Sequence, residues 1–471
     1  MPSFSLNTTD TVAKTLSNNQ VGLIGVNGAL QVFGPAITTS GAAFLSIAGS
    51  VQGFNNTIDA TNGTSLTLIV TQTGSITGFG PAVVANLTTE SIISNSGTIQ
   101  TNGDVLVLTA DAQAPNGLNH NVQNSGVISG NRDAIVLQHN TLGVTEILNS
   151  GTIMAGRHAI DNILTTSGIT LVRNTGEIIA GQDVNTGSGL DFAYRGGSSA
   201  DYLVNQGLIN GLVDMGPGAD FYNAAGGTTA GAVRGGTGND TLQGGDSADR
   251  LEGDNDADLL IGRGGDDVID GAAGSDMMLG GAGNDSMTGG NNNDTMNGNA
   301  GDDTMEGGAG NDILVGQDGS DLMDGGALDD TMDGGNGDDI LEGDTGNDIL
   351  RGRAGEDDLA GGLGRDFLTG GQDADVFVFR SLSETVVGAM RDQILDFEQG
   401  LDNIVVAGLS PGVFEFRGTA GFAPSGNPEL RLIETATGST IVQLDANGDG
   451  TADAEIRVAN VTGLTADDFT L

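Results

Sequence analysis

A nine-residue repeat that begins at Gly235 constrains the fold of this chain more than any other feature of its sequence. From there sixteen consecutive nonapeptides run to Val378 without an insertion, from GGTGNDTLQ and GGDSADRLE through to GGQDADVFV. Position 1 is glycine and position 6 is aspartate in every unit, and position 8 is always apolar. A period of this kind, held in one register throughout, is typical of stacked repeats rather than of an ordinary globular core.

The repeated positions each have a physical reason. Glycines near the start of a unit permit positive φ and a tight turn, and the last few residues can form a short strand with one apolar side chain facing inward. Stacked units would bury a ladder of position-8 side chains and align the turns, each with one aspartate, in columns along two edges. Carboxylates in close columns repel one another unless cations neutralise them, and oxygen ligands with flexible coordination favour calcium.

Composition and charge limit the possible partners. Of the 471 residues, 81 are glycine and only 4% are aromatic, so there is little material for ordinary cores. The net charge is −46, and residues 235–378 contribute −29 of it through 34 acidic and 5 basic side chains. Nucleic acid and anionic membrane surfaces are therefore poor partners. The chain has no cysteine for disulfides or thiolate metal sites, and it has no apolar run long enough to predict a membrane span.

The nonapeptide resembles the RTX (repeats-in-toxin, hemolysin-type) calcium-binding repeat, whose consensus is G-G-x-G-x-D-x-U-x. In that family two nonapeptides make one turn of a right-handed parallel β-roll, and calcium lies between turns stacked on the same edge. The resemblance implies multiple calcium ions, at up to fourteen positions between two columns of eight turns. It also implies that backbone carbonyls of positions 1, 3 and 5 and the position-6 carboxylates are the ligands. These carboxylates belong to Asp240, Asp249, Asp258, Asp267, Asp276, Asp285, Asp294, Asp303, Asp312, Asp321, Asp330, Asp339, Asp348, Asp357, Asp366 and Asp375.

Two questions about the repeats stay open at the level of sequence. Units that contain Asp254, Asn292 and Leu328 depart from the glycine pattern, so the sequence does not decide whether they form sites. The alternative to a β-roll is a disordered, acidic, glycine-rich linker. We expect disorder only when calcium is absent, because the thin core alone does not stabilise the fold and the ion must add the missing stability.

The first segment, residues 1–215, has a longer repeat. The motif N-x-G-x-I recurs at Asn95, Asn124, Asn149, Asn174 and Asn205, and looser copies precede it. The spacing of its glycines matches the coil length of a β-solenoid. Alternating stretches such as AIVLQHN and GITLVRN predict the strands. The segment resembles the β-helical passenger and adhesin repeats of bacterial surface proteins.

One cluster in this segment suggests an alternative function. Arg132 and Arg157 are separated by one such coil, so they are predicted to stack on neighbouring coils together with Asp133, His158 and Asp161. Polysaccharide lyases, hydrolases and epimerases built on β-helices use such groups. A surface ladder at a coil corner explains the same residues without catalysis. The histidines do not form the H-E-x-x-H motif of a zinc protease.

The last segment, residues 379–471, is predicted to close the roll. The phrase D-x-I-x-D-F-x-x-G-x-D-x-I, from Asp392 to Ile404, resembles the capping region of serralysin-type proteases, and the final DDFTL resembles the end of type I (ABC-transporter) secretion substrates. We expect such an export route because the N-terminal residues lack the pattern of a secretory signal. The phrase DANGDGTAD resembles the first part of an EF-hand loop and predicts a further calcium site, or a polar β-turn, at Asp445, Asn447, Asp449 and Asp453.

The sequence therefore predicts an all-β protein. It would consist of a parallel β-solenoid (1–215), an RTX β-roll (216–378, with nonapeptides from 235) and a β-rich cap and secretion region (379–471). The predicted function is that of a secreted, extracellular or cell-surface calcium-binding protein, structural or adhesive, with a polysaccharide as a possible ligand. Whether the chain is an enzyme stays open, and a polysaccharide-modifying lyase or epimerase is the alternative.

Overall fold

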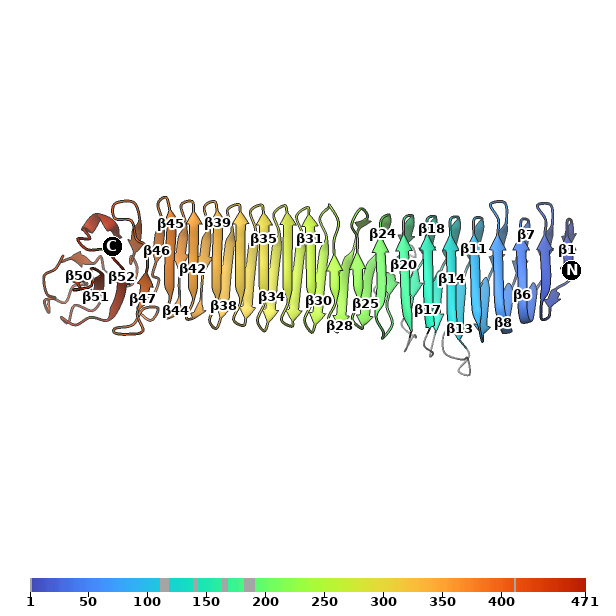
Figure 1. The fold of residues 1–471 in the computed structure, drawn as a ribbon, viewed down its shortest axis with the longest axis horizontal. Helices are drawn as coiled ribbons and strands as arrows, with labels where there is room; N and C mark the ends of the chain where they lie inside the picture. Colours follow the sequence, from blue (N-terminus) through green and yellow to red (C-terminus); the bar gives the residue numbers. More distant parts are fainter. Residues whose placement is uncertain (1, 111–117, 139–142, 163–167, 182–190, 411) are drawn as a thin grey trace. The chain divides into compact units, whose positions relative to one another are not determined.

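The structure is a computed structural model that describes residues 2–110, 118–138, 143–162, 168–181, 191–410 and 412–471. It divides into two compact units, residues 1–258 and 259–471. Both units consist almost wholly of parallel β-strands that stack coil upon coil (Figure 1). The all-β solenoid and β-roll architecture predicted from the sequence is confirmed.

The first unit is a solenoid whose coils contribute to three parallel walls. Wall 1 contains β1 (Pro2–Leu6), β4 (Gln20–Ile24), β11 (Glu90–Asn95), β14 (Leu118–Asn124), β17 (Gly143–Asn149), β20 (Ile169–Asn174), β23 (Asp201–Asn205), β26 (Phe221–Asn223) and β29 (Thr241–Gln243). Wall 2 contains β2 (Thr9–Asp10), β5 (Ala29–Gln31), β7 (Ser50–Gly53), β9 (Ser75–Gly78), β12 (Thr98–Thr101), β15 (Val127–Gly130), β18 (Thr152–Ala155), β21 (Glu177–Ile179), β24 (Leu208–Asn210) and β27 (Thr228–Thr229).

Wall 3 contains β3 (Lys14–Leu16), β10 (Val83–Leu87), β13 (Leu106–Ala110), β16 (Ile135–Gln138), β19 (Ile160–Asp161), β22 (Phe192–Arg195), β25 (Leu212–Pro217), β28 (Ala232–Thr237) and β30 (Arg250–Asn255). Two long strands, β6 (Ile37–Ile47) and β8 (Ile58–Val70), pair with strands of walls 1 and 3.

The N-x-G-x-I motif forms the corner between walls 1 and 2. Its asparagines are buried and pair side chain to side chain: the Nδ2 of Asn124 donates to the Oδ1 of Asn149 at 2.8 Å, and the Nδ2 of Asn149 donates to that of Asn174 at 2.7 Å. The motif glycine is required because a Cβ on Gly126 would lie 2.7 Å from the backbone carbon of Ser96 on the preceding coil. The motif isoleucines stack in register along wall 2, fully buried.

The second unit is a two-column roll in which each strand pairs with the strand two nonapeptides further on, as Leu259 does with Met277. One column contains β31 (Leu259–Gly264), β33 (Met277–Ala282), β35 (Thr295–Ala300), β37 (Ile313–Asp318), β39 (Thr331–Asn336), β42 (Ile349–Ala354) and β45 (Phe367–Gln372). The other contains β32 (Val268–Ala273), β34 (Ser286–Asn291), β36 (Thr304–Ala309), β38 (Leu322–Ala327), β40 (Ile340–Glu342), β41 (Thr345–Gly346), β43 (Asp358–Ala360), β44 (Leu363–Gly364) and β46 (Val376–Val378).

The strands of the roll are longer than the sequence predicts. Most run for six residues, from position 7 of one nonapeptide to position 3 of the next, so only positions 4 to 6 form the turn. The reason is that position 2 adopts positive φ inside the strand without ending it, as at Arg263 (85°) and Gln317 (85°). Side chains at position 8 form the core, and every one of them is fully or almost fully buried.

The C-terminal residues close the roll with strands of their own. β47 (Asp392–Ile394) and β48 (Asn403–Val405) extend the two columns, and they pair in parallel with β52 (Ala454–Val458) and β53 (Phe469–Thr470). The remaining elements are β49 (Glu415–Phe416), β50 (Glu429–Glu434), β51 (Thr440–Asp445) and the short 3-10 helix η1 (Ala466–Asp468). Within the described residues, no helix has the length and apolar character that crossing a membrane requires.

Candidate metal centre

The turns of the roll hold the position-6 aspartates inside the protein. All sixteen are buried, although aspartate ordinarily lies at the surface. The reason is local: in most units, positive φ at positions 2 and 4 curls the turn over its own aspartate. Units that lack the usual glycine keep this backbone, since Asp254, Asn292 and Leu328 adopt φ of 73°, 76° and 82°. At these three residues, departure from the glycine pattern therefore does not alter the turn.

A hydrogen-bond ladder runs through each column of aspartates. The backbone amide of Asp285 donates to the Oδ1 of Asp303 at 2.8 Å, and the amide of Asp303 donates to the Oδ1 of Asp321 at 2.8 Å. In the other column the amide of Asp294 donates to the Oδ1 of Asp312 at 2.8 Å. One oxygen of each carboxylate is thus fixed by the coil next to it.

The second carboxylate oxygen is different. Within the part of the chain that the structure describes, the buried Oδ2 of the following position-6 aspartates accepts no hydrogen bond: Asp240, Asp285, Asp294, Asp303, Asp312, Asp321, Asp330, Asp339, Asp348, Asp357, Asp366 and Asp375. Burying a carboxylate oxygen without a hydrogen-bond donor destabilises the fold, because the oxygen loses its contacts with water and gains none in the protein. Repetition of the same deficit coil after coil indicates a ligand that the polypeptide itself does not supply.

Backbone carbonyls converge on the same place. A Cβ built on Gly289 would lie 2.6 Å from the Oδ2 of Asp294 and 2.6 Å from the carbonyl oxygen of Gly307, one coil further on. A Cβ on Gly307 would likewise lie close to the carbonyl oxygen of Gly325 and the Oδ2 of Asp312. Glycine at position 1 therefore keeps open a space lined by a carboxylate and a carbonyl oxygen, which is the ligand chemistry that calcium prefers.

Electrostatics support the need for a cation. Burial, together with the carboxylates on the coils before and after, raises the pKa of Asp294 and Asp303 to about 7. The same causes raise the pKa of Asp348 to about 8 and that of Asp330 to about 7. Without a cation, the ionised form of these columns is disfavoured at neutral pH. A hard divalent ion would reverse that preference, and the residues present fit calcium.

The ladder continues into the cap, which the sequence analysis did not predict. The amide of Asp366 donates to the Oδ1 of Asp392 at 2.9 Å, and the amide of Asp375 donates to the Oδ1 of Asp402 at 3.1 Å. Both acceptors are buried. The steps to Asp392 and Asp402 are longer than two nonapeptides, so a search for the strict period misses them, but their positions at strand starts after a gap in the period could have identified them.

The predicted EF-hand-like site forms a compact loop between β51 and β52. Its four residues lie together, but the loop's own donors engage the carboxylates: Asp445 accepts from the amides of Gly448 (2.7 Å) and Gly450 (2.7 Å), and Asp453 accepts from the side chain of Asn447 (3.1 Å). Asp449 accepts from the amide of Thr451 at 2.9 Å. These contacts form a polar β-turn, and calcium binding there stays a prediction.

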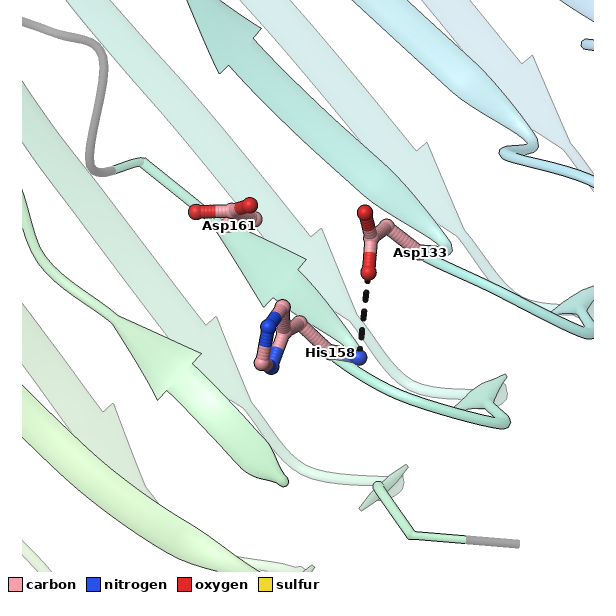
Figure 2. Close-up of side chains that lie close together, drawn as sticks. All are labelled: Asp133, His158 and Asp161. Atoms are coloured by element: carbon pink, nitrogen blue, oxygen red, sulfur yellow. Dashed lines mark hydrogen bonds between the residues drawn. The ribbon is translucent and has the colours of Figure 1, made fainter. Parts of the chain in front are cut away.

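The cluster predicted around Arg157 is assembled on wall 3. One ligand atom from each of Asp133, His158 and Asp161 lies within 4.8 Å of the other two, and all three residues are buried (Figure 2). Arg157 forms an ion pair with Asp133, and Arg195 pairs with Asp161 at 2.8 Å. Sequence reasoning missed Arg195, because the step from Asp161 to it is longer than one regular coil.

Ion pairing sets the protonation of this cluster. Burial alone would raise the pKa of Asp133, but the hydrogen bond and charge of Arg157 outweigh it and lower that pKa. Burial lowers the pKa of His158, and the positive charge of Arg195 lowers it further. The imidazole is therefore neutral at neutral pH, and its Nδ1 accepts a hydrogen bond from the amide of Phe192 at 3.2 Å.

Comparison with known protein families decides the nature of the repeats. The family model of the RTX calcium-binding nonapeptide repeat matches this chain in overlapping copies between residues 226 and 379. Residues 226–379 are RTX calcium-binding repeats. These RTX repeats therefore bind calcium, in several copies, as the sequence predicted.

Two further comparisons complete this result. Among solved structures, the chain is similar to the AlgE6R3 subunit of the mannuronan C5-epimerase from Azotobacter vinelandii. The sequence identity is 31%, the match covers 31% of this chain and 78% of that one, and the TM-score is 0.25. No curated protein sequence matches the chain.

Proposed function

We propose that this chain is a secreted calcium-binding protein that folds when it meets calcium outside the cell and serves a structural or adhesive role at a bacterial surface or in its matrix. The observation that carries the proposal is the repeated buried Oδ2 that accepts no hydrogen bond within the described residues. The position-6 aspartates and the position-1 carbonyls would hold the ions. Bound calcium supplies the positive charge that lets these columns pack in ionised form.

Export by a type I system fits the same physics. In the structure the C-terminal DDFTL is folded, since Asp468 and Phe469 are buried and β53 pairs with β48. A chain must be unfolded to pass through a transporter channel, and low calcium inside the cell would leave the columns repulsive and the cap without a partner. High calcium outside would then drive folding in one direction.

The experiment on export uses deletion of residues 379–471. We expect the shortened chain to stay inside a host that carries a type I transporter, while the full chain accumulates in calcium-containing medium. A matched control replaces the EF-hand-like residue Asp449 by Asn, which leaves the C-terminus intact and should leave export unchanged. Normal secretion of the shortened chain, without lysis, would contradict the proposed route.

The solenoid offers a surface for an extended polar ligand. A groove of about 510 Å³ crosses several coils beside the asparagine ladder and is lined by side chains that include Ser96, Ser125, Ser150 and Arg173. Repeated hydroxyls at coil spacing suit the hydroxyls of a polysaccharide, and Arg173 suits a carboxylate on it. Loss of binding to an acidic polysaccharide in Arg173→Ala, with binding kept in Arg132→Ala, would support this role; equal binding by both variants and the wild type would contradict it.

A second candidate function is polysaccharide modification at the cluster of Asp133, His158 and Asp161. It is favoured by the neutral His158 imidazole held between two arginine-paired carboxylates, because a neutral imidazole can act as a general base. Incubation with acidic polysaccharides should then give unsaturated or epimerised products, and turnover should fall about 100-fold or more in His158→Ala. If no product forms with the calcium-loaded wild type, the adhesive role stands alone.

A further inference from the structure

Two phrases before the RTX repeats place aspartates in the same column. Residues 196–204 read GGSSADYLV and residues 215–223 read MGPGADFYN, so each has an aspartate at the sixth position. The structure aligns them with the first nonapeptide. In the parallel strand register, Arg195 of β22 lies beside Asp214 of β25, and Asp214 lies beside Arg234 of β28. Both steps are slightly longer than two nonapeptides, which hides the two phrases from any search for a strict period.

The hydrogen-bond ladder of the roll passes through both aspartates. The amide of Asp201 donates to the Oδ1 of Asp220 at 2.6 Å, and the amide of Asp220 donates to the Oδ1 of Asp240 at 2.7 Å. The amide of Asp240 donates in turn to the Oδ1 of Asp258 at 2.7 Å. Asp201 and Asp220 precede the residues that the family model matches, yet their amides donate as those of the position-6 aspartates do. The Oδ2 of Asp201 itself accepts from the amide of Gly197 at 2.9 Å.

Asp220 shows the same deficit as the repeats. The residue is only 3% exposed, and its Oδ2 accepts no hydrogen bond from any described residue. The carboxylates of Asp201, Asp214 and Asp240 add negative charge around it. Arg234, on the adjoining coil, pairs with Glu252 at 2.6 Å, so its guanidinium is directed to another carboxylate.

The oxygen-lined space found over the position-1 glycines recurs here. A Cβ on Gly196 would lie 3.0 Å from the Oδ2 of Asp201 and would collide with the carbonyl oxygen of Met215. At Gly235, in the first nonapeptide, the corresponding neighbours are the Oδ2 of Asp240 and the carbonyl oxygen of Gly253 at 2.9 Å. A carboxylate oxygen and a carbonyl oxygen from the next coil therefore face one another in both places.

We propose that calcium binding begins two coils before the RTX repeats, at a site formed by the carboxylates of Asp201 and Asp220 and the carbonyl of Met215. The inference rests on the calcium binding of the repeats themselves. It makes the last coils of the solenoid dependent on calcium, so that the ion stabilises the segment in which the long coils shorten to two nonapeptides.

The chain provides its own spectroscopic probe for this site. It has no tryptophan and three tyrosines, which are Tyr194, Tyr202 and Tyr222, and all three lie on the coils of the proposed site. Terbium replaces calcium at oxygen sites and emits when a tyrosine close to it is excited. Tyrosine-sensitised emission therefore reports ions bound near these coils in preference to ions bound further along the roll.

The experiment titrates terbium into the calcium-free full-length chain and excites tyrosine. We expect strong emission from the wild type, a several-fold loss in Asp220→Asn, and no loss in Asp303→Asn, which removes a carboxylate far along the roll. Metal analysis after dialysis against calcium should show both variants losing bound calcium. Calcium should reverse the emission by competition.

The outcomes separate this proposal from the function of the repeats. Emission unchanged in Asp220→Asn, with calcium lost from Asp303→Asn, would overturn the upstream site and leave the roll intact. Calcium content unchanged in Asp303→Asn would instead contradict the proposed ligands of the roll. If Asp220→Asn does not fold, the wild type alone decides: absence of tyrosine-sensitised emission at saturating terbium overturns the proposal.

Discussion

The asparagine corner of the solenoid and the aspartate columns of the roll solve the same problem in opposite ways. Both stack one buried polar side chain per coil, and both join it to the next coil by hydrogen bonds. Asparagine has a donor and an acceptor, so each amide satisfies the next, and Asn149 also donates to the carbonyls of Gly151 and Glu177. Ionised aspartate only accepts. One atom type in the side chain therefore separates a ladder that is complete by itself from one that needs a cation.

The difference also determines where stability comes from. In the solenoid, the amide ladder lies beside stacked isoleucines such as Ile128 and Ile153, so hydrogen bonding and apolar burial reinforce each other. In the roll, the core consists mainly of one position-8 side chain per nonapeptide. The stability gained by burying it is opposed by the repulsion between the carboxylates of each column. We infer that the solenoid coils up to β21 are stable without metal and that the roll is not.

Removal of calcium should give the largest effect. In excess chelator at neutral pH, residues 259–375 should lose their β-structure and exchange their amides rapidly, while residues 118–138, 143–162 and 168–181 keep slow exchange. Hydrogen exchange with mass spectrometry, read peptide by peptide, measures both regions in one sample. Equal protection of both regions in verified calcium-free protein would abolish the contrast.

Acidification should partly restore the calcium-free roll. The pKa of Asp294, Asp303, Asp330 and Asp339 is raised to about 7 in the folded state, from a usual value near 3.8. A raised pKa contributes stability that is fully present below the unfolded value and is lost as pH rises through the folded value. In chelator, β-content measured by circular dichroism should therefore be higher at about pH 4 to 5 than at pH 8.

The control for this pH dependence is the calcium-loaded protein, whose carboxylates are held ionised by the metal. Its β-content should stay level from pH 6 to 8, and calcium affinity should rise over that interval because binding releases protons. A calcium-free roll that gains structure as pH rises would show that the carboxylate columns are not the reason for its instability.

Conversion of one ladder into the other should have a smaller, local effect. Asn149→Asp would place a carboxylate against the Oδ1 of Asn174 and two carbonyls, so we expect a loss of about 3 kcal/mol in the free energy of unfolding of the solenoid. Asn149→Ala, which removes the side chain without adding charge, should cost less. Chemical denaturation in saturating calcium compares them, and equal losses would show that charge is not what distinguishes the two ladders.

The smallest expected effect concerns backbone strain in the roll. Leu328 has φ of 82° at position 4, where most units have glycine, and its side chain is 60% exposed. Leu328→Gly should stabilise the calcium-loaded roll by about 0.5–1 kcal/mol. The matched control Leu322→Gly, in a strand and also exposed, should destabilise it by a similar amount. Thermal unfolding in calcium measures both, and destabilisation by Leu328→Gly would contradict strain at that turn.

Much of the fold could be predicted from the sequence because its information is local and repeated. The nine-residue period specifies the apolar spine and the turn aspartates, because every copy repeats the same contact; the resemblance to RTX repeats implied two units per coil. The N-x-G-x-I motif similarly predicts a stacked corner: Asn124 contacts Asn149 because one coil separates them. For such residues, distance along the chain and distance in space are related by a constant.

Tertiary structure alone decided the contacts that cross an irregular step. Arg195 forms an ion pair with Asp161, and the Oδ1 of Asp392 accepts a hydrogen bond from the amide of Asp366. Neither spacing along the chain matches the period of the repeats. Asp220 joins the column through a coil slightly longer than two nonapeptides. The physical reason is that a stack fixes which strands are neighbours, whereas the loops between them vary freely in length. Sequence therefore determined the repeating unit, and only the folded chain showed where the column of carboxylates begins and ends.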